Sequence, residues 1–199
     1  MSSHHFVREG QEPALYIVEP LSLALVEPLL EWAPLVIVSV NALADVLKWK
    51  IKIDVILLLQ DAESNYADAI ADQGPVETLY YQNEGDIPGM LAAFLTRQKC
   101  SGLNIVTRAL PDVLDPWILM VNEVDVSIID TDAKWSAVQS TFQKWLPVNS
   151  KVSIGLSERR SCECTGLRRI ADRLFLTEKS GIITIQSDSP FWVGEYLEN

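Results

Sequence analysis

The stretch DVILLLQDAES, residues 54–64, indicates a buried strand that runs into a polar turn. The apolar residues Val55–Leu59 follow one another without alternating with polar ones. Such runs are typical of a parallel sheet in which both faces are covered. In open sheets of this kind, ligands bind just beyond the carboxyl ends of the strands. The turn that begins Gln60-Asp61 is therefore the first place to look for chemistry.

Strand-like and helix-like segments alternate along the first two-thirds of the chain, with helical segments of about ten residues. This alternation predicts βαβ units and a parallel sheet. The predicted strands are ALYIV (14–18), LVIVSV (35–40), IDVILLL (53–59), VETLYY (76–81), LNIVTRAL (103–110) and VDVSIID (124–130).

The last third of the chain changes character. From about Ala133, short segments with period-two alternation are separated by Gly, Ser, Asn and Asp turns, which predicts antiparallel strands in a small sandwich. The predicted fold class is α/β: an N-terminal parallel-sheet α/β domain, residues 1–135, followed by a small antiparallel β-sandwich domain, residues 136–199.

The composition of the chain excludes several classes of function. The formal net charge of −11 argues against non-specific binding to nucleic acid, because phosphates would repel the chain. The longest apolar runs are far shorter than the ~18 residues that a membrane span needs. The opening MSSHHFVREG contains no apolar core of a secretory signal. We therefore expect a cytoplasmic protein that binds neither membrane nor nucleic acid.

Metal ligands are scarce. His4 and His5 are the only histidines, which excludes a site built from several imidazoles in the folded domains. The three cysteines include a Cys-x-Cys pair, Cys162 and Cys164, which has the spacing to contact a metal. Alternate positions on a strand are the simpler explanation of that spacing. No metal is expected.

Glycines are missing where a nucleotide cradle would need them. None occurs between Gly10 and Gly74, although three strands and their following turns are predicted there. Phosphate-binding loops use glycine because only glycine lets backbone amides approach phosphate oxygens closely. Neither GxGxxG nor GxxxxGK[ST] occurs anywhere in the chain. A conventional nucleotide cradle is excluded.

Four segments carry a family resemblance: MSSHHFVREGQEPAL (1–15), LLEWAPLVIVSVNALADVLKWKIKIDVILL (29–58), FQKWLPVNSKVSIGL (142–156) and CTGL (164–167). Together with the order of elements, they resemble thiamine pyrophosphokinase (thiamine diphosphokinase), in particular its Bacteroidetes branch. The resemblance covers nearly the whole chain. It implies an α/β domain that binds ATP and a C-terminal β-sandwich domain that contributes to a thiamine site across a homodimer.

The chemical motifs of that family are largely replaced. The acid and glycine that end its second strand fall on Val40-Asn41. Its GDFDS-type turn falls on Leu58-Leu59-Gln60-Asp61, and its K-T-D stretch on Glu84-Gly85-Asp86. Its G-R-x-D-H stretch falls around residues 110–115, without arginine or histidine. The serine–asparagine loop that helps to hold thiamine has no counterpart in residues 174–181.

Asp61 and Asp86 remain as catalytic candidates, and with Glu63 they have the chemistry to surround one cation. The alternative is that they are turn and helix-cap residues, which aspartate often is. Asp115, ahead of Pro116, is expected to cap a helix. Cofactor-binding residues are not assigned.

Arginines gather in the β-domain, where they suggest a site for a phosphate or an acidic surface. The same pattern also fits a solvated strand face. The candidates for anion binding are Arg159, Arg160, Arg168 and Arg169.

Three functions follow from the resemblance and its departures. The leading one is a homologue that has lost ATP:thiamine pyrophosphoryl transfer and acts as a homodimeric binding or regulatory protein, without a cofactor. The second is a weak or redirected enzyme that uses ATP and Mg²⁺. The third is a sensor of a small, thiamine-like ligand.

Overall fold

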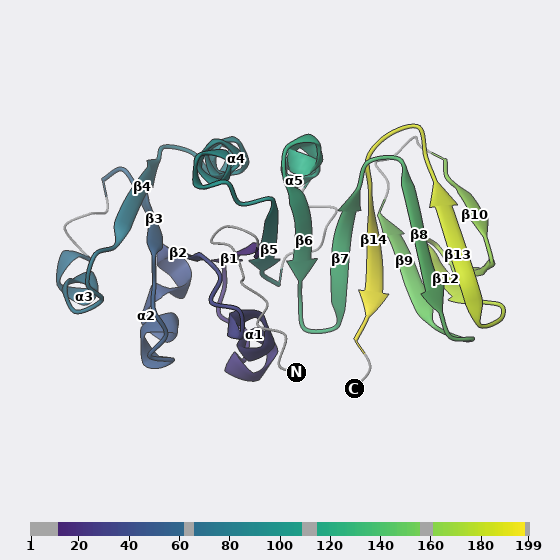
Figure 1. The fold of residues 1–199 in the computed structure, drawn as a ribbon, viewed down its shortest axis with the longest axis horizontal. Helices are drawn as coiled ribbons and strands as arrows, with labels where there is room; N and C mark the ends of the chain where they lie inside the picture. Colours follow the sequence, from purple (N-terminus) through teal and green to yellow (C-terminus); the bar gives the residue numbers. More distant parts are fainter. Residues whose placement is uncertain (1–11, 62–65, 109–114, 156–160, 198–199) are drawn as a thin grey trace, which may run out of the picture. The chain divides into compact units, whose positions relative to one another are not determined.

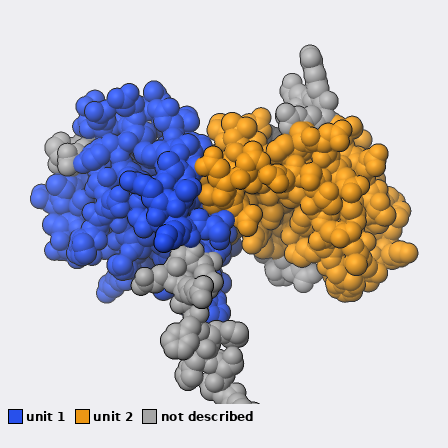
Figure 2. Space-filling view, turned by 45° about the horizontal axis from the view of Figure 1, so that its top comes forward, with its two compact units in different colours: residues 1–106 blue, residues 107–199 orange. Residues whose placement is uncertain are grey.

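The computed structural model describes residues 12–61, 66–108, 115–155 and 161–197. The chain divides into two compact units, residues 1–106 and residues 107–199, which Figure 2 colours blue and orange. The predicted domain boundary between residues 135 and 136 stays a prediction. The boundary between the two compact units falls earlier in the chain, between residues 106 and 107.

Unit 1 contains a parallel sheet in the order β5-β1-β2-β3-β4. Its elements, drawn in purple to teal in Figure 1, follow the predicted alternation of strands and helices. They are β1 (Ala14–Ile17), α1 (Leu23–Leu30), β2 (Val36–Ser39), α2 (Val40–Lys48), β3 (Val55–Leu59), α3 (Ala67–Ala71), β4 (Glu77–Tyr81), the 3₁₀ turn η2 (Glu84–Asp86), α4 (Ile87–Gln98) and β5 (Gly102–Val106).

The apolar run of residues 55–59 forms strand β3, as predicted. In β3, Val55 to Leu58 are buried, and Leu59 emerges from the sheet with 43% of its surface exposed. The strand pairs in parallel with β2 on one side and β4 on the other, which explains its unbroken apolar run. The segment predicted as strand 35–40 ends one residue early, because α2 begins at Val40 without an intervening loop.

Helices cover the sheet in two groups. Alternate strand residues such as Leu15, Val38 and Ile56 join one core cluster with side chains of α1, α2 and α3. The buried side chains of α4 are absent from that cluster. Because the chain returns from β4 to β5 at the far side of β1, a right-handed crossover places α4 on the other face.

Unit 2 consists mainly of antiparallel strands, which confirms the predicted change of character. One sheet has the order β11-β12-β9-β14-β7-β6 and the other the order β10-β13-β8. The elements are α5 (Asp115–Ile118), the 3₁₀ turn η4 (Leu119–Asn122), β6 (Asp125–Ile129), β7 (Ala133–Val138), β8 (Thr141–Leu146), β9 (Lys151–Gly155), β10 (Glu163–Thr165), β11 (Leu167–Ala171), β12 (Leu174–Thr177), β13 (Gly181–Gln186) and β14 (Phe191–Tyr196).

The two sheets of unit 2 form a sandwich. Ile183 and Ile185 of β13 pack with Ile154 of β9 and with Phe191 and Val193 of β14 in one core cluster. Within β13 the two buried isoleucines alternate with the exposed Ile182 and Gln186 and the half-buried Thr184, as expected for a strand with one buried face.

A hydrogen-bonded carboxylate organises the turn between β6 and β7. Asp130 is 8% exposed, and one of its oxygens accepts the backbone N–H groups of Asp132 and Ala133, each at 2.7 Å. The other oxygen accepts the indole N–H of Trp135 at 3.1 Å. A buried carboxylate is acceptable here because both oxygens are hydrogen-bonded.

Among the residues that the structure describes, no helix is long and apolar enough to cross a membrane.

Candidate functional site: the carboxyl edge of the parallel sheet

Polar side chains gather where β1 to β4 end, on the turns or the helix start that follows each strand. Because these strands are parallel, their carboxyl ends share one edge of the sheet, where ligands bind in this class of fold. We call this the carboxyl edge. Its polar residues are Glu19, Asn41, Gln60, Asp61, Gln82, Asn83, Glu84 and Asp86.

Two neighbouring turns of the carboxyl edge are joined by uncharged groups. The backbone N–H of Gln60 donates to the carbonyl of Tyr81 at 3.1 Å. The side-chain amide of Gln82 donates to the side-chain oxygen of Gln60 at 2.9 Å. This amide pair holds together the turn that contains Asp61 and the turn that leads to Asp86.

Asp61 and Asp86, the two catalytic candidates, are both exposed. Asp61 lies in the turn directly after β3. Asp86 precedes α4 and makes no side-chain cap bond there, and one of its oxygens accepts a long hydrogen bond, 3.4 Å, from the Asn83 amide. The catalytic assignment stays a prediction. Glu63 lies outside the described residues.

Phenols lie beneath the carboxyl edge. Tyr16 is 2% exposed, and burial raises the pKa of its hydroxyl well above the ordinary value, with further increases from the nearby Tyr81 and Glu84. Partial burial and Glu84 also raise the pKa of Tyr81. Both phenols are therefore neutral at physiological pH. No sequence pattern indicates this pair, because Tyr16 occupies an ordinary buried strand position.

Positive side chains of unit 1 lie away from the carboxyl edge. Among its described residues, the only basic side chains are Lys48, Lys50, Lys52, Arg97 and Lys99. They lie in or just after the last turns of α2 and α4, or precede β3, at the amino edge of the sheet. Lys52 is also paired with Asp54 at 2.5 Å. The described turns after β3 and β4 therefore carry Asp61, Glu84 and Asp86 and no lysine or arginine, whereas Arg108 follows the end of β5.

The described side chains of the carboxyl edge do not form a binding site for a nucleoside triphosphate and its metal ion. No group of three or more His, Cys, Asp or Glu side chains that could hold a metal occurs among the described residues. Leu59, at the position where the resembling family has a metal-binding acid, contributes an apolar, partly exposed side chain. Residues 62–65 and 109–114 lie outside the described residues.

Backbone amides at the end of β1 are already used. The N–H groups of Val18 and Glu19 both donate to the carbonyl of Val106 in β5, at 3.0 and 3.4 Å. The strand order changes direction between β1 and β5, and this switch point is where dinucleotide folds present free amides to phosphates. The two strand ends are instead bonded to each other, in agreement with the missing glycines.

The arginine candidates are separated in unit 2. Arg168 and Arg169 are neighbours on β11 and both are exposed, so their side chains project to opposite faces of the strand. Arg169 is held by Asp172 at 2.8 Å and by the Ala171 carbonyl at 3.2 Å. Arg159 and Arg160 lie outside the described residues. The anion site stays a prediction.

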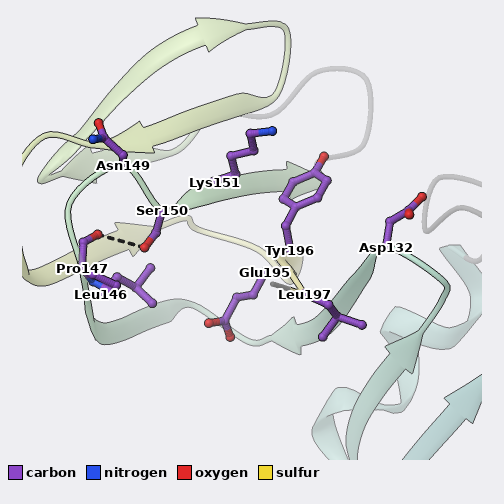
Figure 3. Close-up of a pocket in the computed structure, with 9 residues that line it drawn as sticks. All are labelled: Asp132, Leu146, Pro147, Asn149, Ser150, Lys151, Glu195, Tyr196 and Leu197. Atoms are coloured by element: carbon purple, nitrogen blue, oxygen red, sulfur yellow. Dashed lines mark hydrogen bonds between the residues drawn. The ribbon is translucent and has the colours of Figure 1, made fainter. Parts of the chain in front are cut away.

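Sequence reasoning missed a pocket of about 660 Å³ in unit 2. Its lining includes Leu146, Glu195 and Leu197, together with the exposed Asp132 and Lys151 (Figure 3). These residues come from strand ends and turns far apart in the sequence, so no local motif announces the pocket. Figure 3 shows the side chains of Glu195 and Tyr196 pointing away from each other, as alternation along β14 requires.

The geometry of this pocket includes one ion pair at its margin. Glu195 Oε2 lies 2.6 Å from Lys144 Nζ of β8, so the bond joins the two sheets of the sandwich. Tyr196 hydroxyl and Ser153 hydroxyl are 3.1 Å apart on the other face of β14. The pocket therefore combines two carboxylates, one ammonium group and two leucines.

The two units define the class of fold: an α/β unit with a parallel sheet is followed along the chain by an antiparallel β-sandwich unit. That fold is the fold of thiamin pyrophosphokinases. The enzyme from Geobacillus thermodenitrificans superposes with a TM-score of 0.64 at 10% sequence identity, covering 94% of this chain and 98% of that chain. The enzyme from Candida albicans gives 0.61 at 7% identity, covering 94% and 90%.

A protein from Lactobacillus plantarum also superposes with a TM-score of 0.64, at 11% identity, covering 95% of this chain and 100% of that one. No family model matches the sequence, and no curated protein matches it. At these identities the likeness establishes the fold alone.

Proposed function

We propose that this chain is a thiamine pyrophosphokinase-like protein that has lost ATP:thiamine pyrophosphoryl transfer and acts as a binding or regulatory homologue. The observation that carries the proposal is the charge of the carboxyl edge. The described turns after β3 and β4 carry Asp61, Glu84 and Asp86 and no Lys or Arg, and Arg108 lies beyond the end of β5.

Phosphoryl transfer is catalysed mainly by positioning and by positive groups that neutralise the transferred phosphates. Loss of a single electrostatic donor commonly costs ~10²–10³ in rate. Glu84, where the family has lysine, adds repulsion toward a triphosphate. The two exposed carboxylates of Asp61 and Asp86 lie on separate turns, and they do not form a binding site for the complex of ATP with Mg²⁺.

The direct test is calorimetry of the full chain with ATP, Mg²⁺ and thiamine, together with an assay for thiamine diphosphate. We expect no heat of ATP binding and no product above the rate without protein. Formation of thiamine diphosphate at rates typical of enzymes, above ~1 s⁻¹, would overturn the proposal.

The alternative is a weak or redirected enzyme that depends on ATP and Mg²⁺. It is favoured by the hydrogen bonds that join the turn of Asp61 to the turn that leads to Asp86. If that alternative holds, Asp61→Ala abolishes turnover. Asp68→Ala, which removes an exposed acid from the first turn of α3, is the matched control.

A sensor of a small, thiamine-like cation is favoured by the pocket of unit 2. Its volume lies within the ~300–1,000 Å³ that small-molecule sites occupy. Its charged lining residues are Asp132, Lys151 and Glu195, of which Glu195 is paired with Lys144, and leucines supply apolar walls. Thiamine alone should then raise the melting temperature, and Asp132→Asn should weaken that effect. An exposed acid of β10, Glu163, provides the control Glu163→Gln.

We also propose that the chain forms a homodimer through the outer face of the β10-β13-β8 sheet. Trp145 and Ile182 are cross-strand partners on this face and are 60% and 65% exposed. Glu163 is the single charged side chain among the outward positions, which otherwise carry Thr and Gln. In a chain of net charge −11, a nearly uncharged face is where a second copy meets least repulsion.

A further inference from the structure

Two thiols meet on β10. Cys164 lies in this strand and Cys162 immediately precedes it, and their sulfur atoms are 3.6 Å apart. Residues two apart on a strand project from the same face, so the backbone itself brings the thiols together. Both cysteines are free thiols.

The surroundings of the pair are apolar. Both side chains are half-buried and pack against the core cluster of the sandwich, which includes Ile183 and Ile185 of β13. Glu163, between them in the sequence, projects from the opposite face of the strand. No group of three or more metal-binding side chains exists in the described parts of the chain. The described donor set is therefore two sulfur atoms.

Two sulfur donors select a narrow class of ion. Structural zinc sites need about four ligands, and Ca²⁺ and Mg²⁺ need oxygen ligands. Soft thiolates favour soft d¹⁰ ions such as Cu⁺. We propose that Cys162 and Cys164 form a two-thiolate site for a soft monovalent cation of the Cu⁺ and Ag⁺ class. This inference is independent of the proposed function.

Binding is a simple exchange of protons for the ion. Two S–H bonds break, two sulfur–metal bonds form, and two protons leave to solvent; no electron is transferred. With sulfur–metal bonds of about 2.3 Å, as for zinc thiolates, an ion coordinated linearly by the two sulfurs sets them about 4.6 Å apart. The sulfurs need to separate by about 1 Å, which small side-chain rotations supply.

The experiment titrates Ag⁺, which does not oxidise thiols in the way copper does, into the full chain carrying Cys100→Ser. Cys100 is buried in unit 1 and would otherwise contribute background. We expect one tightly bound ion per chain, release of two protons per ion, and a raised melting temperature.

The Cys162→Ser and Cys164→Ser variants should each bind Ag⁺ about tenfold more weakly or worse and lose the gain in melting temperature. Two ions per chain, or one proton released per ion, would overturn the proposal even if a variant failed to fold. Single-cysteine variants that bind as tightly as the pair would overturn it as well.

Discussion

The ring of Trp135 lies directly over Gly194 on the neighbouring strand. The two residues are cross-strand partners of β7 and β14, and a Cβ atom built on Gly194 would lie 2.7 Å from the indole ring. The indole N–H donates to Asp130, so the ring cannot turn away without losing a hydrogen bond. This contact requires glycine for its lack of a side chain.

Gly194→Ala should therefore destabilise the protein by about 1–3 kcal/mol, the usual cost of overpacking a well-packed site. Urea unfolding followed by fluorescence measures the change. Gly85→Ala is the matched control, because nothing lies within 4 Å of its added Cβ and its φ is not positive. Equal stability of the two variants would show that the Trp135 ring is free to move.

Trp145→Lys and Ile182→Lys should convert the proposed dimer to monomer. Each places a charge in an apolar pair, and a two-fold interface would bring that charge against its own copy. Sedimentation at micromolar concentration measures the change. Trp32→Lys is the control, because Trp32 is 60% exposed in unit 1. A wild-type chain that sediments as a monomer would exclude the dimer.

Alkaline pH should destabilise unit 1 through Tyr16. Its raised pKa means that the folded state keeps a proton that the unfolded state loses above pH ~10, so stability falls as pH rises beyond that value. The slope approaches about 1.4 kcal/mol per pH unit for one such group. Tyr16→Phe should flatten the dependence between pH 9.5 and 11 in urea unfolding. An unchanged slope would refute the assignment.

The Cys164 thiol should react slowly with iodoacetamide at neutral pH. Burial, and then the hydrogen bond and proximity of Cys162, raise its pKa to about 12, so little reactive thiolate is present. Mass spectrometry of tryptic peptides gives the alkylation rate, which should rise continuously from pH 7.5 to 10. A rate at pH 7.5 equal to that of a free thiol peptide would contradict this expectation.

The strands and the fold class were predictable from the sequence, because the spacing of apolar residues along a strand reflects which of its faces are buried. The run Val55–Leu59 identified a central parallel strand, and alternation in Gly181–Gln186 identified a sandwich strand. The resemblance supplied the order of elements, and the superposed enzymes confirm that fold. The absence of glycine after β1 agrees with amides of Val18 and Glu19 that bond to β5.

The sites were less predictable because they depend on side chains that meet only after folding. The pocket around Glu195 joins residues 132, 146–147, 149–151 and 195–197, which share no local pattern. Arg168 and Arg169 look like one cluster in the sequence, yet adjacent positions on a strand face opposite ways. Cys162 and Cys164 show the reverse case, since spacing by two brings their sulfur atoms into contact.

The amide bond between Gln60 and Gln82 has a consequence for how this edge of the molecule responds to its ionic surroundings. Turns bridged through a divalent ion loosen when a chelator removes the ion. Here neutral side chains fasten the turns directly, so their spacing is insensitive to EDTA and to moderate changes in salt. The spacing of these two turns is therefore independent of the magnesium supply of the cell.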